Sequence, residues 1–153
     1  MQFKLSDLSR SIVKVQLLQD VSSSHYDVKI NNAADVDKLF GAQLRKLDRE
    51  YLLAIYLNSR NYVIDIEVVA IGCLTEVPVH PREILKSAIL ANAYCFILVH
   101  NHPSGDQQPT KDDHRITEDM IKAGRLMHIP LKDHVIIGEG WFSFFEAKRN
   151  GEI

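Results

Sequence analysis

A short apolar run, Tyr94 to Val99, constrains the fold of this 153-residue chain more than any other segment. A run so short and so apolar is typical of a strand that is buried on both faces. Such a strand lies inside a sheet, with other elements covering each side. We therefore expect Tyr94–Val99 to be the central strand of a covered sheet.

Patterns on both sides of this run predict further strands. The runs Tyr51–Leu57 and Val63–Ile71 are rich in β-branched and aromatic residues, and a loop of Asn, Ser and Arg joins them, which indicates an antiparallel hairpin. Near the C-terminus, the runs Val135–Gly138 and Trp141–Phe144 flank a Gly-Glu-Gly turn and indicate a last strand pair.

Two helices are expected between these strands. Pro81 opens the first with Pro in its first turn, and an apolar stripe continues before Asn92. The second runs from Thr110 or Lys111 to about Met127, with apolar residues at three- and four-residue spacing. The order of strands and helices predicts a mixed α/β or α+β fold.

The first 45 residues are predicted as a lead-in of uncertain structure, and residues 46–153 as one domain. Alternating apolar residues in Val13–Leu17 and Tyr26–Ile30 indicate two short strands. A flexible lead-in as far as about Ser24 is the alternative. Asn32 is expected to cap a helix that Gly41 closes.

Composition narrows the classes of function. With 18 basic and 20 acidic residues the net charge is -2, and basic residues are interleaved with acidic ones, so the charge does not support direct nucleic-acid binding. No run of 18 apolar residues and no signal-peptide core occurs, so we expect no membrane span. The two cysteines lie far apart in apolar contexts, which fits a reducing compartment, so we expect a cytoplasmic protein. Exposed strand edges in such a sheet make a homodimer plausible.

Two histidines and a carboxylate follow the apolar run. His100 and His102 are two residues apart in an extended segment, so their side chains point to the same face. Asp113, eleven residues beyond His102, lies where the second helix begins. Three such ligands would hold Zn²⁺ and leave its fourth position open for water, as in catalytic zinc sites. The structural alternative is that Asp113 only caps the helix in a capping box with Thr110, and that each histidine is an ordinary hydrogen-bonded residue.

The arrangement His100-x-His102, Thr110 and Asp113 resembles the zinc motif of the JAMM, or MPN+, metalloproteases. The string His-Asn-His-Pro-Ser-Gly resembles their RadC-like branch, as do the segments that begin at Pro78 and at Asp133. The likeness covers roughly Tyr51 to Glu146. It implies a JAB-type mixed β-sheet flanked by helices, with zinc held by His100, His102 and Asp113. The family motif has Ser where this chain has Thr110, whose hydroxyl would help to stabilise the tetrahedral intermediate.

The family also places a glutamate on an earlier strand as general base. Glu67 is the candidate here, since a carboxylate among apolar neighbours can have its pKa raised toward the working range of a base. The alternative is that Glu67 belongs to the solvent face of an amphipathic strand, and Glu76 is the runner-up for the base. Ser104 is a further catalytic candidate at the mouth of the site, or else a turn residue. His134 is either a structural residue or a partner of a ligand.

These residues predict a zinc-dependent hydrolase that cleaves a peptide or isopeptide bond in a peptide or protein substrate. The alternative is a RadC-like DNA-repair or mobile-element accessory domain that binds zinc and partners with little or no hydrolysis. A metal-dependent phosphodiesterase or nuclease ranks third, because two-metal sites need more ligands than this chain supplies here.

Overall fold

The computed structural model describes residues 28–72 and 79–151. Within them, five strands form one mixed sheet in the order β2-β1-β3-β4-β5. The strands are β1 (Tyr51–Leu57), β2 (Val63–Ile71), β3 (Cys95–Asn101), β4 (Leu131–Ile137) and β5 (Trp141–Ser143). β3 pairs with β1 antiparallel and with β4 parallel, which confirms its predicted central place.

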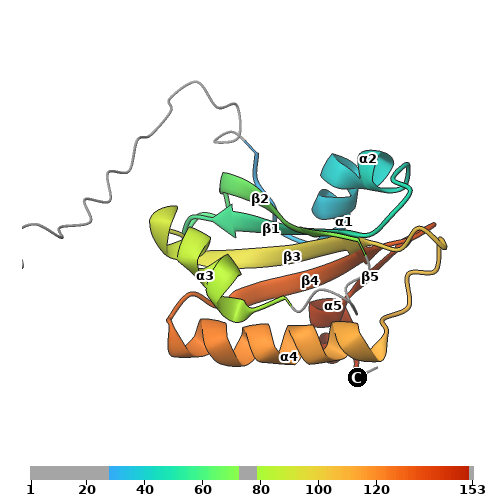
Figure 1. Ribbon diagram of the computed structural model, residues 1–153. Coiled ribbons are helices and arrows are strands. Elements are labelled where there is room, and N and C mark those ends of the chain that lie inside the picture. The colour runs from blue at the N-terminus through green and yellow to red at the C-terminus, as the bar shows by residue number, and fades with distance from the viewer. Residues whose placement is uncertain (1–27, 73–78, 152–153) are drawn as a thin grey trace, which may run out of the picture.

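Helices cover both faces of the sheet, so the fold is α/β, as predicted (Figure 1). One face carries a short helical segment made of α1 (Ala33–Val36), the π-helical turn η3 (Asp37–Gly41) and α2 (Ala42–Leu44). The other face carries α3 (Pro81–Leu90) and the long α4 (Lys111–Leu126). A last helix, α5 (Phe144–Asn150), follows β5 directly and packs against β4 and β5. Of the described helices, none is both long and apolar enough to cross a membrane.

Alternate residues of the strands build two separate cores. Odd-numbered residues of β1 and β3 face the α1–α2 side, where they pack with Ile30, Val36 and Leu44. Even-numbered residues of the same strands face α3 and α4, where they pack with Ile84 and Met120. Both faces of β3 are therefore buried along its full length, as its apolar sequence predicts.

Most predicted elements are confirmed, with differences at their ends. β4 begins at Leu131, four residues before the predicted Val135, because its parallel pairing with β3 begins there. β3 extends beyond Val99 through Asn101, because its parallel pairing with β4 continues to Ile137. Phe144 was expected in the last strand but opens α5, since the Ser143 hydroxyl accepts a hydrogen bond from the Glu146 backbone N–H and caps a helix there. Gly41 was expected to close the first helix, yet the helical segment continues to Leu44.

The N-terminal predictions are only partly within the described residues. Asn32 does cap α1, since its side chain accepts a hydrogen bond from the Asp35 backbone N–H at 3.0 Å. Of the predicted strand at 26–30, the structure describes residues 28–30, where Lys29 makes an isolated bridge to Tyr62. Residues 26–27 and the predicted strand at 13–17 lie outside the described residues. The core continues across residue 45, because α1 and α2 contribute buried residues to the same cluster as β1 and β3.

Candidate metal centre

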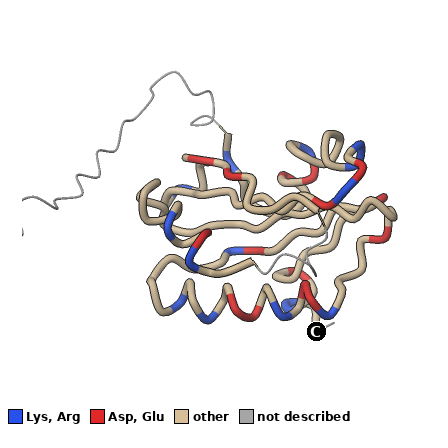
Figure 2. Tube along the Cα trace, in the orientation of Figure 1, with Lys and Arg blue, Asp and Glu red and all other residues tan. Residues whose placement is uncertain are grey.

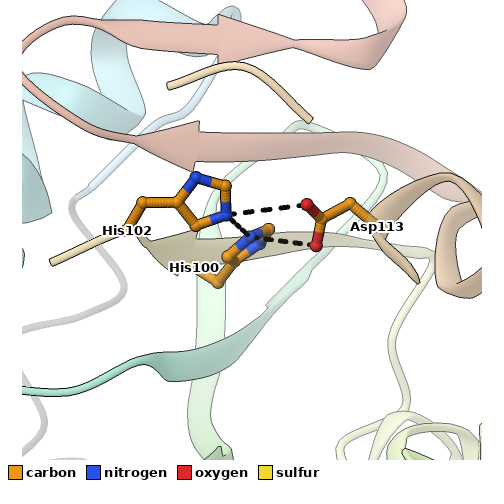
Figure 3. Close-up of side chains that lie close together, drawn as sticks. All are labelled: His100, His102 and Asp113. Carbon is orange, nitrogen blue, oxygen red and sulfur yellow. Dashed lines mark hydrogen bonds and ion pairs between the residues drawn. The ribbon is translucent and has the colours of Figure 1, made fainter. Parts of the chain in front are cut away.

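His100, His102 and Asp113 come together where β3 ends and α4 begins (Figure 3). His100 is the second-last residue of β3, on the face of the sheet that α4 covers. His102 is the first residue beyond the strand, and its backbone N–H donates a 2.9 Å hydrogen bond to the Ile137 carbonyl. Asp113 is in the first turn of α4. The chain thus brings together the three residues that its spacing singled out.

The ligand atoms of the three residues lie within 4.8 Å of one another. His100 Nε2 is 2.9 Å from His102 Nε2 and 3.2 Å from Asp113 Oδ1, and His102 Nε2 is 3.5 Å from Asp113 Oδ2. The His100 and Asp113 side chains are 0% and 2% exposed, and that of His102 is 9% exposed. The group is therefore a nearly closed cluster with its open side at His102.

The loop after β3 fixes the proton on His102. Its Nδ1 lies 2.7 Å from the carbonyl oxygen of Asp106, and a carbonyl only accepts, so Nδ1 must carry the hydrogen. In the neutral ring Nε2 then has a free lone pair, and this atom faces the cluster. The hydrogen bond to Asp113 raises the pKa of His102 above its usual value, so a proton and a metal ion compete for the same nitrogen.

Asp113 both caps α4 and faces the cluster, and its Oδ2 does both, since it also lies 3.5 Å from His102 Nε2. Its Oδ2 accepts hydrogen bonds from the Thr110 backbone N–H at 2.7 Å and from the Thr110 hydroxyl at 2.6 Å, which completes a capping box. Its Oδ1 faces His100. Burial raises the pKa of Asp113, but its close contacts with His100 and His102 and the hydrogen bonds from Thr110 outweigh this and hold it far below the usual range, so the carboxylate is charged. The capping alternative and the ligand interpretation are thus compatible.

The donor set and its spacing fit a divalent metal ion such as zinc. Ligands about 2.1 Å from a tetrahedral ion lie roughly 3.4 Å from one another. The two histidine nitrogens are 2.9 Å apart, and each lies close to this distance from one oxygen of Asp113, His100 Nε2 at 3.2 Å from Oδ1 and His102 Nε2 at 3.5 Å from Oδ2. Two imidazole nitrogens and a charged carboxylate are also donors that zinc prefers. The cluster can therefore bind a metal ion.

The turn between β4 and β5 holds the loop that carries His102. The Glu139 backbone N–H donates to the Gly105 carbonyl at 2.7 Å. A Cβ added at Gly138 would overlap this same carbonyl oxygen and would lie 2.7 Å from the Gln107 nitrogen. The turn and the loop are thus in backbone contact, and glycine at 138 is what allows it.

Behind His100 lies His134, which the structure places in the middle of β4 with no exposed surface. His134 Nε2 is 2.9 Å from His100 Nδ1, and His134 Nδ1 is 2.6 Å from the Thr117 hydroxyl of α4. The Phe144 ring stacks on His134, with 5.2 Å between centroids. Burial lowers the pKa of His134 well below its usual value, so this ring is neutral.

Glu67 lies on the same face of the sheet as the cluster but away from it. Its Oε2 accepts a hydrogen bond of 2.8 Å from the Tyr56 hydroxyl. Glu67 pairs with Ala54, which pairs with Leu98 of β3, two residues before His100. At about 3.3 Å per residue, this is roughly 7 Å along the strand direction, and β1 lies between the strand of Glu67 and β3. The structure does not bring Glu67 to the metal ligands, and its role as base stays a prediction.

The other catalytic candidates are exposed residues of the segment between β3 and α4. Thr110 is exposed, and its hydroxyl donates to Asp113 as described. Ser104 is exposed and accepts a 3.3 Å hydrogen bond from the Asp106 backbone N–H, as a turn residue does. The runner-up base, Glu76, lies outside the described residues.

The sequence reasoning missed one carboxylate, Glu50. Leu52 pairs with His100 in the antiparallel β1–β3 ladder, so continuing the register by two residues places Glu50 opposite His102 and on the same face. Its negative charge contributes to the raised pKa of His102. Glu50 precedes the β1 run directly, and the antiparallel pairing of that run with the histidine strand was the signal that could have found it.

The side chain of Asn101 fixes the backbone on both sides of Glu50. Its Oδ1 accepts a hydrogen bond from the Tyr51 backbone N–H at 2.8 Å, and its Nδ2 donates to the Arg49 carbonyl at 3.0 Å. Asn101 is 1% exposed and points away from the metal ligands, since it lies between them in the strand. The residue between the two histidines thus holds the start of β1 against the end of β3.

Residues 30–151 match the family described as the RadC-like JAB domain, so the chain belongs to that family. Its relatives include UPF0758 proteins of Rubrobacter xylanophilus, 43% identical over 117 residues (76% of this chain, 52% of the relative), and of Methanococcoides burtonii, 45% identical over 125 residues (82% and 54%). A third, from Desulforamulus reducens, is 46% identical over 114 residues (74% and 50%). The chain spans about half the length of these curated relatives, and their names state no activity.

Proposed function

We propose that this domain is a zinc-dependent hydrolase that cleaves a peptide or isopeptide bond. One observation carries the proposal: His100 Nε2, the lone pair of His102 Nε2 and the charged Asp113 converge in a cluster that is buried except at His102. Bound zinc would supply a polarised water and a Lewis acid for the scissile carbonyl. Three protein ligands leave a coordination position for that chemistry, whereas structural zinc sites have four.

We assign the general base to Glu50 in preference to Glu67. Glu50 is half-buried and lies opposite His102 at the open side of the cluster, where an attacking water would enter. Its carboxylate would take the proton from this water and pass it to the leaving amine. Asn101 supports the role, because its amide holds the chain on either side of Glu50 and so limits how far the carboxylate can move.

Thr110 fits a supporting role at the same mouth. Its hydroxyl donates to Asp113 Oδ2 from an exposed position at the start of α4. The same hydroxyl could turn to an oxyanion on a bound substrate, since a hydroxyl has a single rotatable proton. A Thr110→Ser variant should keep activity within a few-fold, and Thr110→Val should lose it.

A matched pair of variants tests the assignment of the base. Glu50→Gln and Glu67→Gln each replace a carboxylate by an amide of the same shape. With zinc-loaded protein and a peptide mixture from a digested proteome, read by mass spectrometry, Glu50→Gln should abolish cleavage while its zinc affinity stays within a few-fold of the parent. Glu67→Gln should cleave as the parent does.

Each contrary result has a distinct meaning. The opposite pattern, an active Glu50→Gln and an inactive Glu67→Gln, would return the role of base to Glu67. A parent protein that binds zinc but cleaves neither these peptides nor isopeptide-linked ones would count against hydrolysis and favour a domain that binds zinc and partners.

The second candidate, a DNA-repair or mobile-element accessory domain, is supported by the family resemblance and not by the distribution of charge on the protein. Basic and acidic residues alternate along α4, and no described element carries a stripe of one sign (Figure 2). Nucleic-acid footprints are usually one-signed. Salt-sensitive binding of the zinc-loaded domain to single- or double-stranded DNA would favour this candidate.

A further inference from the structure

A chain of three buried hydrogen bonds runs from His100 back to α4. His100 Nδ1 lies 2.9 Å from His134 Nε2, His134 Nδ1 lies 2.6 Å from Thr117 Oγ1, and Thr117 Oγ1 lies 2.6 Å from the backbone carbonyl of Asp113. His100 and His134 are 0% exposed and Thr117 is 4% exposed, so water does not compete for these groups. The chain begins and ends at a residue of the metal cluster.

Counting protons fixes the direction of this chain. The Asp113 carbonyl can only accept, so the single proton of the Thr117 hydroxyl is donated to it. The hydroxyl oxygen must then accept the Nδ1–H of His134. A neutral imidazole has one N–H, so His134 Nε2 carries a lone pair and accepts the Nδ1–H of His100. The Nε2 of His100 is left without a proton and faces the cluster, so in the metal-free protein the hydrogen between it and His102 Nε2, 2.9 Å away, belongs to His102.

The reverse direction would be incompatible with a metal ion. If Thr117 donated to His134, its oxygen would face the Asp113 carbonyl oxygen at 2.6 Å with no proton between them. His134 would then donate from Nε2 to His100, and the remaining proton of His100 would move to Nε2. That atom lies 2.9 Å from His102 Nε2, where the metal must bind. The direction of three hydrogen bonds thus decides whether His100 can be a ligand.

We propose that Thr117 and His134 are positioning residues that set the tautomer of His100, and through it the metal affinity of the site. The tautomer is set before any substrate is present. It is set by the Thr117 hydroxyl, which donates to the backbone carbonyl of Asp113. Asp113 supplies both a ligand oxygen and that carbonyl. It therefore also orients His100, through Thr117 and His134.

The inference rests on the proposed zinc site but not on hydrolysis. Its first test is nuclear magnetic resonance of the metal-free parent protein, in which nitrogen–proton correlations of the imidazoles distinguish the two tautomers. His100 and His134 should both carry their hydrogen on Nδ1. A His100 hydrogen on Nε2 would overturn the proposal, whether or not the protein hydrolyses anything.

The second test uses substitutions at Thr117. Thr117→Val has nearly the same shape and removes the hydroxyl, so His134 is free to turn and zinc affinity should fall about 10- to 100-fold, as is typical when a partner of a ligand is lost. Thr117→Ser keeps the hydroxyl and should bind zinc within about three-fold of the parent. Zinc affinity is measured by competition with a chelator.

A neighbouring residue separates this role from general destabilisation. Ile116→Val trims the apolar core of the same helix turn and lowers stability without touching the chain of hydrogen bonds. It should leave zinc affinity unchanged. If Thr117→Val binds zinc as the parent does, or if Ile116→Val loses as much affinity as Thr117→Val, the proposal is wrong.

Discussion

The two histidines of the cluster are equivalent as ligands but are supported in different ways. His100 is backed by buried side chains of β4 and α4, whereas His102 is backed by the carbonyl of Asp106 in its own loop. A side-chain support can be removed by one substitution that leaves the fold in place. A hydrogen bond to a backbone carbonyl cannot be removed by substituting a side chain, and it is lost only when the loop moves. The difference teaches that the two halves of one metal site respond to different kinds of change.

The largest effect is expected from moving the loop. Gly138→Ala would place a methyl group against the backbone of Gly105 and Gln107, and such overpacking typically costs about 1–3 kcal/mol of stability. The displaced loop carries His102, so zinc affinity should fall by about 10- to 100-fold. Thermal unfolding and a chelator competition measure the two effects.

Gly140→Ala is the matched control in the same turn. A Cβ at this position meets nothing closer than the side chain of Gln107 at 3.6 Å, which is ordinary contact. Its zinc affinity and stability should equal those of the parent. If the two alanine variants behave alike, the loop is not held by its contact with Gly138.

Acidification should act on the loop side before the buried side. Its hydrogen bond to Asp113 raises the pKa of His102 above 6.5, whereas burial lowers that of His134 well below 6.5. In the metal-free protein His102 therefore keeps its proton to higher pH, and a metal ion must displace it. Below the raised pKa, zinc affinity should fall by about ten-fold per pH unit for this one proton.

Imidazole resonances followed from pH 5 to 9 measure both titrations directly. His102 should change its charge above 6.5, and His134 should remain neutral over the whole range. A His134 that becomes charged near its ordinary pKa would show that the support of His100 is more open than its burial implies.

A smaller effect is expected one layer farther from the metal. Asp133 is buried, and its Oδ1 accepts hydrogen bonds from the backbone N–H groups of His134 at 2.8 Å and Phe145 at 3.0 Å. Asp133→Asn keeps an oxygen for these donors but alters the 2.7 Å bond from the Ser143 hydroxyl to Oδ2. We expect a loss of about 0.5–1.5 kcal/mol in the free energy of unfolding, with zinc affinity nearly unchanged.

Asp133→Ala provides the upper bound for this position. It leaves the donors of β4 and α5 without an acceptor, so the loss of stability should be larger, about 1–3 kcal/mol or more. Urea unfolding of the metal-free variants compares the two. Equal losses for Asn and Ala would mean that Asp133 contributes through its charge rather than through these hydrogen bonds.

Much of the fold could be predicted from local patterns. The apolar run of β3, the β-rich hairpin strands and the proline at the start of α3 each carry a strong signal, and the structure confirms them. The ends of elements were harder, because they depend on partners far away in the chain. Parallel pairing with β4 extends β3 through Asn101, and the cap by Ser143 ends the last strand one residue early.

The cluster was predictable, and its surroundings were predictable only in part: His134 was a candidate partner of a ligand, whereas Glu50 was not a candidate. His100, His102 and Asp113 have a spacing that brings them together through local geometry alone. Glu50 and His134 reach the cluster through strand pairing across about 50 and 34 residues of chain, and no local pattern reports such a register. Glu67 was chosen for its apolar neighbours, but in the structure its carboxylate accepts a hydrogen bond from the Tyr56 hydroxyl.

The hydrogen bonds behind His100 connect three elements that are separate in the sequence: β3, β4 and the first turns of α4. For the ring of His134 to leave its place, all three elements must separate, so the free energy of local unfolding is high in this part of the protein. The amide hydrogens of β3 and β4 should then exchange with solvent only when the whole domain unfolds. The loop at residues 103–109, by contrast, can exchange while the rest of the protein stays folded.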